Sequence, residues 1–106
     1  MSKFMRIIVF FDLPVVAAKD RKAASQFRKF LLKDGYHMIQ FSVYTRVCNG
    51  MDAVKKHEER LNDNLPSKGS VRLLTLTDKQ YDMMKILLGS KMFDDESMAS
   101  DVMNFF

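Results

Sequence analysis

The sequence predicts one domain of mixed α and β structure in which strands and helices alternate. Three observations carry this prediction. An apolar run over residues 6–14 ends at a carboxylate and a proline, apolar residues recur at helical spacing over residues 21–34, and the spacing changes to a period of two over residues 36–48. A chain of 106 residues can bury one modest core, and at this size docking to a second copy adds useful burial.

Composition narrows the class of protein. The apolar fraction of 47% and the charged fraction of 28% are those of an ordinary soluble protein. The longest apolar run, residues 7–11, is far too short to cross a bilayer, and we expect a cytosolic (cytoplasmic) protein with no membrane partner. The single cysteine, Cys48, cannot form an internal disulfide. The two histidines, His37 and His57, lack metal-ligand spacing, which argues against a zinc or haem site.

Positive charge is concentrated in the first half of the chain. Residues 1–50 carry nine Lys and Arg against three Asp and Glu, whereas residues 51–106 carry eight against ten. An excess of this kind is expected of a protein that meets phosphates, although many basic proteins bind no nucleic acid.

The apolar run at residues 7–11, which follows Arg6, predicts the first strand. Its side chains are apolar on both alternating phases, which is expected of a strand in the centre of a sheet. Pro14 lacks a backbone donor and ends the strand. Asp12 then lies at the carboxyl end of the strand, an edge where ligands and metals collect. Two interpretations stay open: Asp12 is a functional carboxylate, or it caps the turn before the first helix.

Residues 21–34 predict the first helix, which ends at Gly35. One arc of the helix is apolar, and the opposite arc forms a stripe flanked by Arg21 and Arg28. The stripe consists of Lys22, Gln26, Lys29 and Lys33. It is either a phosphate-binding surface or a plain solvated face.

Residues 36–48 predict a strand that can bend near Gln40 into two shorter pieces. Alternation would place Ile39, Phe41, Val43 and Val47 on one face and Gln40, Ser42, Tyr44 and Arg46 on the other. A polar but uncharged set such as Gln40, Ser42 and Tyr44 suits a subunit interface. Arg46, at the far end, could reach a phosphate or a carboxylate of a partner.

The second half of the chain repeats the alternation. A turn at Asn49 and Gly50 precedes a helix over residues 51–65, a loop over residues 66–69 and a strand over residues 70–76. Residues 77–80 resemble a helical capping box. Periodicity does not decide whether residues 83–88 form a helix or a strand.

The final segment, residues 91–106, differs in composition from the domain at residues 1–90. Acidic residues alternate with large apolar ones, a composition typical of a segment that folds onto another surface. The apolar residues that we expect to contact a partner are Phe93, Met103, Phe105 and Phe106. The alternative is a loose terminus.

The residues quoted so far resemble a known family. The chain is similar to the CRISPR-associated Cas-two family, the small subunit of the spacer-acquisition machinery, and most to its members from type II systems. The resemblance rests on the strand end at residues 11–14, the helix residues 27–31, Gly35 with Tyr36, and the Gln-x-Ser-Val run at residues 40–43. It continues through residues 71–73, 79–80 and 85–89.

This resemblance implies an α+β fold, a ferredoxin-like βαββαβ sandwich with an extra C-terminal strand at residues 83–88, in a homodimer whose sheets pack together. The family's dimer bridges two integrase dimers and holds duplex DNA during spacer acquisition in antiviral defence. The DNA contacts implied for this chain are Arg21, Lys22, Arg28, Lys29, Lys33 and Arg46, made to phosphates without reading sequence. The tail would dock on the integrase.

The resemblance also implies a possible activity. Members of the family are often described as metal-dependent endonucleases in which the strand-end aspartate, here Asp12, binds Mg²⁺ across the dimer axis. Two Asp12 carboxylates could share one ion that activates water against a phosphodiester of RNA or DNA. A two-metal nuclease needs more carboxylates, but the only second acid nearby, Asp20, lies on the helix side, and no histidine base is close. We therefore rank the scaffold first and the nuclease second.

A third class stays open. The same element order suits a small-molecule regulator or an RNA-recognition module, although the aromatic sheet signature of that module and a glycine-rich phosphate loop are both absent from the sequence.

Overall fold

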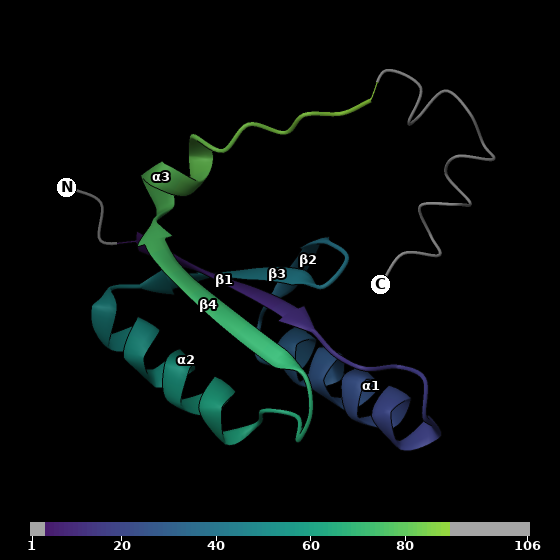
Figure 1. The fold of residues 1–106 in the computed structure, drawn as a ribbon. Coiled ribbons are helices and arrows are strands. Elements are labelled where there is room, and N and C mark those ends of the chain that lie inside the picture. Colours follow the sequence, from purple (N-terminus) through teal and green to yellow (C-terminus); the bar gives the residue numbers. More distant parts are fainter. Residues whose placement is uncertain (1–3, 90–106) are drawn as a thin grey trace.

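The computed structural model describes residues 4–89, and its elements alternate as predicted (Figure 1). They are β1 (Phe4–Asp12), α1 (Ala18–Lys33), β2 (His37–Gln40), β3 (Val43–Asn49), α2 (Met51–Asp63), β4 (Ser70–Thr77) and α3 (Asp78–Asp82). The order βαββαβ, followed by the short α3, confirms the expected α+β, ferredoxin-like fold. α1 begins three residues earlier than the sequence predicted, and α2 ends two residues earlier.

The four strands form one antiparallel sheet in the order β2-β3-β1-β4. β1 is central, as its apolar run predicted, because it pairs with β3 on one side and β4 on the other. Helices α1 and α2 both lie against the same face of the sheet (Figure 1). We call this the helix face and the opposite one the open face.

The core lies between the sheet and the two long helices. Ile7, Val9 and Phe11 alternate along β1 and are all buried on the helix face. Phe27 and Leu31, one turn apart on α1, pack against them. The rings of Phe11 and Phe27 meet edge to face with centroids 5.3 Å apart. Burying each large apolar side chain contributes roughly 1.5–3 kcal/mol, and this face therefore anchors the strand that carries Asp12.

The chain reverses direction where the sequence predicted a bent strand. β2 and β3 pair antiparallel, and the turn between them places Ser42 at a φ of 61°. Alternation restarts after this turn, so Tyr44 pairs with Val9 and points to the helix face. Its side chain is only 4% exposed and stacks on Phe11 with centroids 5.6 Å apart. The prediction that Tyr44 lies on a polar, partner-facing surface is therefore wrong.

Arg46 also faces the helices, which contradicts its prediction as an outer phosphate contact. Its Nη1 donates a hydrogen bond to the backbone oxygen of Asp34 at 2.8 Å, next to the end of α1. Gly35, at a φ of 91°, makes this approach possible, because a Cβ there would lie 1.8 Å from Nη1 of Arg46. The guanidinium therefore lies inside the fold, with its Nη1 bonded to Asp34 and its Nε buried.

Asp34 connects α1 to α2. His57 Nδ1 lies 3.2 Å from Asp34 Oδ2, and Arg60 donates to both carboxylate oxygens. His57 is half-buried at the edge of the core. Nearby on β3, the free thiol of Cys48 is buried, and burial raises its pKa.

The capping box at the start of α3 is present. Thr77 Oγ1 accepts a hydrogen bond from the Gln80 backbone at 3.0 Å, and Gln80 Oε1 accepts one from the Thr77 backbone at 2.9 Å. Arg6 on β1 holds α3 against the sheet, because its Nε donates to Asp78 at 2.8 Å and its guanidinium lies 4.1 Å from the centre of the Tyr81 ring.

Residues 83–89 form neither a strand nor a helix within the single chain. They extend away from α3 (Figure 1), and their large apolar side chains are exposed, up to 89% for Leu87. The extra C-terminal strand therefore stays a prediction that requires a partner. The predicted docking tail, residues 91–106, lies outside the described residues. Within residues 4–89, every helix is too short or too polar to cross a bilayer.

Candidate metal and nucleic-acid site at the end of strand β1

Asp12 is the last residue of β1 and its side chain is exposed, whereas the preceding Phe11 is fixed in the core. Asp12 pairs with Ser70, the first residue of β4. This pairing depends on Gly69, whose φ is 90° and where a Cβ would lie 2.5 Å from the backbone oxygen of Asp12. The fold thus presents the carboxylate on a rigid strand end.

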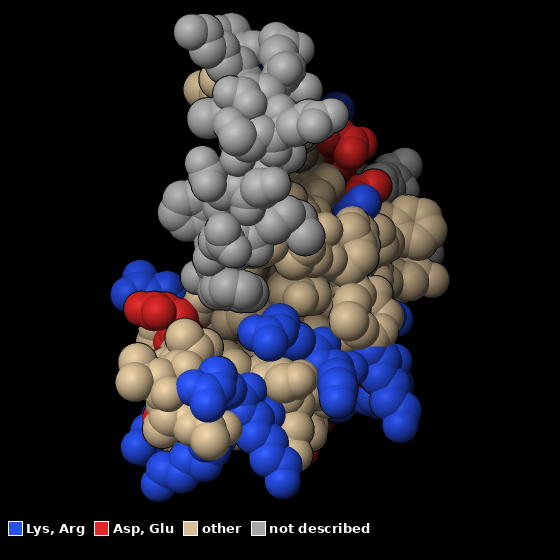
Figure 2. Space-filling model, turned by 90° about the vertical axis from the view of Figure 1, so that its right-hand side faces the viewer, with Lys and Arg blue, Asp and Glu red and all other residues tan. Residues whose placement is uncertain are grey.

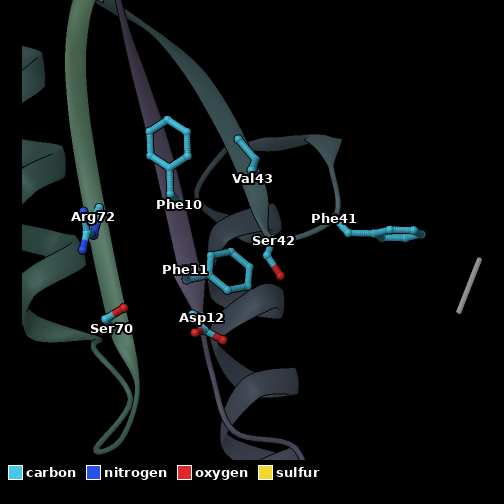
Figure 3. A pocket seen from close by; sticks show the side chains of 8 residues that line it. All are labelled: Phe10, Phe11, Asp12, Phe41, Ser42, Val43, Ser70 and Arg72. Atoms are coloured by element: carbon cyan, nitrogen blue, oxygen red, sulfur yellow. The ribbon is translucent and has the colours of Figure 1, made fainter. Parts of the chain in front are cut away.

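A hollow of about 250 Å³ opens beside Asp12 on the open face (Figure 3). In Figure 3, Asp12 lies between Ser70 of β4 and Ser42 of the β2–β3 turn, with Arg72 further along β4 and Phe41 directed away. The complete lining is Phe10, Phe11, Asp12, Phe41, Ser42, Val43, Ser70 and Arg72. The hollow therefore combines a carboxylate, two hydroxyls and a guanidinium.

A second cation approaches Asp12 from the helix side. Arg28 of α1 lines a smaller hollow of about 40 Å³ together with Asp12 and Ser42. Among the described ion pairs, none involves Asp12, Arg28 or Arg72. The two guanidiniums on either side of Asp12 suit a phosphate-bearing ligand, because each can donate hydrogen bonds to its oxygens. The Asp12 carboxylate would repel the same phosphate unless a cation lay between them.

The oxygen donors at Asp12 fit Mg²⁺ only in part. Mg²⁺ is commonly held by one or two carboxylates together with phosphates and water. The described residues contain no group of three or more His, Cys, Asp and Glu side chains that could hold a metal. Asp20 does not supply the second carboxylate, because it lies on α1 and faces Lys68 at 3.9 Å. If Asp12 held Mg²⁺, the remaining ligands would come from water, substrate phosphates or a second copy.

The basic stripe of α1 is on the molecular surface, as the helical spacing predicted. Lys22, Lys29 and Lys33 are exposed, and Arg28 is half-buried at the edge of the stripe. Figure 2 shows Lys and Arg side chains gathered on the lower part of the molecule, where α1 lies in Figure 1. Arg21 is exposed but donates hydrogen bonds to the backbone oxygens of Val15 and Val16, which fixes the loop before α1.

The structure does not place the three predicted interface residues, Gln40, Ser42 and Tyr44, on one surface. Gln40 ends β2 and is exposed, Ser42 lies in the turn beside Asp12, and Tyr44 is in the core. The open face instead exposes apolar side chains, with Phe10 37% and Leu74 50% exposed. Sequence reasoning did not select Ser70 and Arg72 as site residues. Their proximity to Asp12 follows from the β1–β4 register, which no local motif reveals.

A model of the family described as CRISPR associated protein Cas2 matches residues 5–84. The chain belongs to the Cas2 family. The match includes the βαββαβ unit except its first residue, together with α3, Asp12 and the basic stripe of α1.

Individual Cas2 proteins agree with this assignment. The chain is similar to a protein of Acidovorax ebreus named CRISPR-associated endoribonuclease Cas2, with 58% identity over 94 residues that cover 89% of this chain and 92% of that protein. Cas2 proteins with the same name from Ligilactobacillus salivarius and Streptococcus mutans are 48% and 44% identical, covering 90% and 91% of this chain and 94% and 85% of their own lengths.

Proposed function

We propose that this chain works in CRISPR adaptation in the cytoplasm, as a homodimer that holds duplex DNA and bridges two integrase dimers during spacer acquisition. The observation that carries the proposal is the exposed row of Lys22, Lys29 and Lys33 along α1, which has the spacing and the accessibility for contacts to a DNA backbone. Such contacts position a duplex without reading its sequence.

The open face supports a homodimer. Phe10, Val47 and Leu74 expose apolar surface there, and residues 83–88 add a further exposed apolar segment. β4 is an edge strand of the described sheet, and its outer backbone groups can accept another strand. In the proposed dimer, residues 83–88 of each copy join the sheet of the other. The tail at residues 91–106 is proposed to dock on the integrase.

A second candidate function is a Mg²⁺-dependent endonuclease at Asp12. Three Cas2 relatives are named endoribonucleases, and the hollow beside Asp12 contains groups that suit a phosphodiester. Asp12 would supply a metal ligand, and Arg72 and Arg28 would hold the phosphate. When bound, Mg²⁺ supplies Lewis-acid activation of water and of the phosphate.

The substitution Asp12→Asn tests the ranking of the two functions. It preserves the shape of the side chain but removes the charge that a metal needs. We expect spacer insertion by the matching integrase to persist, because the α1 stripe is unchanged. The measurements are insertion into a CRISPR array and, for each protein alone, Mg²⁺-dependent cleavage of RNA and DNA.

The matched control is Asp52→Asn, which removes an exposed carboxylate at the start of α2, outside the hollow. If Asp12→Asn abolishes insertion and cleavage together while the dimer stays folded and Asp52→Asn abolishes neither, the site is catalytic and the ranking reverses.

A further inference from the structure

A groove lies between α2 and the edge strand β4, away from the Asp12 hollow. It has a volume of about 470 Å³ and is lined by Glu58, Glu59, Asn62 and Leu73. We call it the acidic groove. Leu73 lines it and is 36% exposed, and no ion pair within residues 4–89 involves Glu58 or Glu59. Two acidic side chains beside uncovered apolar surface suit a ligand that is both cationic and apolar.

Residues 83–88 have this combination of properties. The segment is apolar except for Lys85, which has no ion pair with a described residue. In a strand, side chains alternate between faces, so Met83, Lys85 and Leu87 share one face and Met84, Ile86 and Leu88 share the other. One face thus carries the only charge and the other is entirely apolar.

The β1–β4 register shows which residues of β4 each face would meet. Leu73 pairs with buried Val9, so it lies on the helix face beside α2. Leu74 pairs with Ile8 and lies on the open face, where it is 50% exposed. A strand added to the outer edge of β4 with Lys85 on the helix face would bring its ammonium to the acidic groove. Its apolar face would then continue the surface around Leu74.

We propose that Lys85 of one copy binds in the acidic groove of a second copy and fixes the register of the exchanged strand. A slip by one residue moves every side chain of a strand to the opposite face. Here that slip would place Lys85 beside Leu74 and leave Glu58 and Glu59 facing apolar side chains. The groove thereby favours one register over its neighbours. This inference rests on the proposed homodimer, which it makes more specific.

The test mixes two variants of the full chain with different tags. The first carries Lys85→Glu, and the second carries Glu58→Lys with Glu59→Lys. Each variant alone brings like charges together in its own dimer. In the mixed dimer, Glu at position 85 of the first variant meets the two introduced lysines, and Lys85 of the second meets the native glutamates. Both contacts are then attractive.

We expect each variant alone to dimerise about tenfold more weakly than the native chain, because two symmetric surface contacts become repulsive. Mixing is expected to restore near-native dimer affinity, measured by sedimentation and by co-purification of the two tags. Lys56→Glu is the matched control, since this exposed lysine of α2 does not line the acidic groove. It should leave the dimer affinity unchanged.

The outcomes separate this inference from the proposed function. Two outcomes overturn the contact of Lys85 but leave the homodimer in place. In one, the native chain dimerises and the variants dimerise just as tightly. In the other, the variants lose dimer affinity and mixing does not restore it. A native chain that is monomeric at all accessible concentrations overturns both. Variants that are well-folded monomers and stay monomeric when mixed, beside a dimeric native chain, also contradict the register contact.

Discussion

At the scale of a single residue, His57 makes the stability of the contact between α1 and α2 depend on pH. Burial lowers its pKa below the ordinary 6.5, the nearby Arg46 lowers it further, and Asp34 opposes the change. The unfolded chain therefore binds the His57 proton more tightly than the folded chain does. The stability that this difference contributes is complete above pH 6.5 and is lost as the pH falls through the lower, folded-state pKa.

We predict that the free energy of unfolding falls as the pH drops below the ordinary histidine pKa of 6.5 and that His57→Gln reduces this slope, because the substituted side chain has no proton to gain. The measurement is urea unfolding across the pH range at one protein concentration. His37→Gln is the control, since His37 is exposed on β2. An equal slope for His57→Gln and the native chain would contradict the assignment.

Two glycines allow a comparison at the scale of elements. Gly69, before β4, and Gly50, before α2, have nearly equal φ values of 90° and 92°. A Cβ at Gly69 would collide with the backbone of Asp12, whereas a Cβ at Gly50 would meet nothing within 4 Å. Both substitutions share the backbone strain, but only Gly69→Ala also forces the ends of β1 and β4 apart.

Gly50→Ala is expected to cost about 1–3 kcal/mol of unfolding free energy, because Gly50 has a φ of 92° and a ψ of 172°, a backbone region that is essentially restricted to glycine. Gly69→Ala is expected to cost more and to displace Asp12. Urea unfolding of the two variants side by side measures the difference. Equal losses would mean that the turn before β4 shifts freely and does not set the position of Asp12.

The sequence predicted most of the elements because their signals are local. The apolar run of β1, the helical stripe of α1 and the capping box of α3 each lie within one short window. Tyr44 and Arg46 were misplaced because the reversal at Ser42 restarts strand alternation, and that turn lacks the usual glycine. Ser70 and Arg72 were not selected because their approach to Asp12 depends on pairing between strands almost sixty residues apart.

At the scale of the whole molecule, the three lysines of the α1 stripe do not line the hollows beside Asp12. We predict that Lys22→Glu, Lys29→Glu and Lys33→Glu together weaken binding to every duplex sequence alike and flatten its salt dependence, because phosphate contacts release counterions. The control changes three exposed lysines on other elements, with Lys55→Glu, Lys56→Glu and Lys79→Glu. The DNA affinity of both triple variants is measured from binding isotherms at several salt concentrations. An equal loss of affinity in the two variants would mean that net charge alone explains the effect.

The buried Cys48 gives this protein an internal reporter of its own motions. It is the only thiol in the chain, it is 3% exposed, and burial raises its pKa, so the reactive thiolate is scarce in the native state. An alkylating reagent can label Cys48 only when β3 separates from the helices. The labelling rate therefore measures how often the core opens, and a slower rate in the presence of DNA would reveal that binding tightens the interior, with no cysteine introduced into the chain.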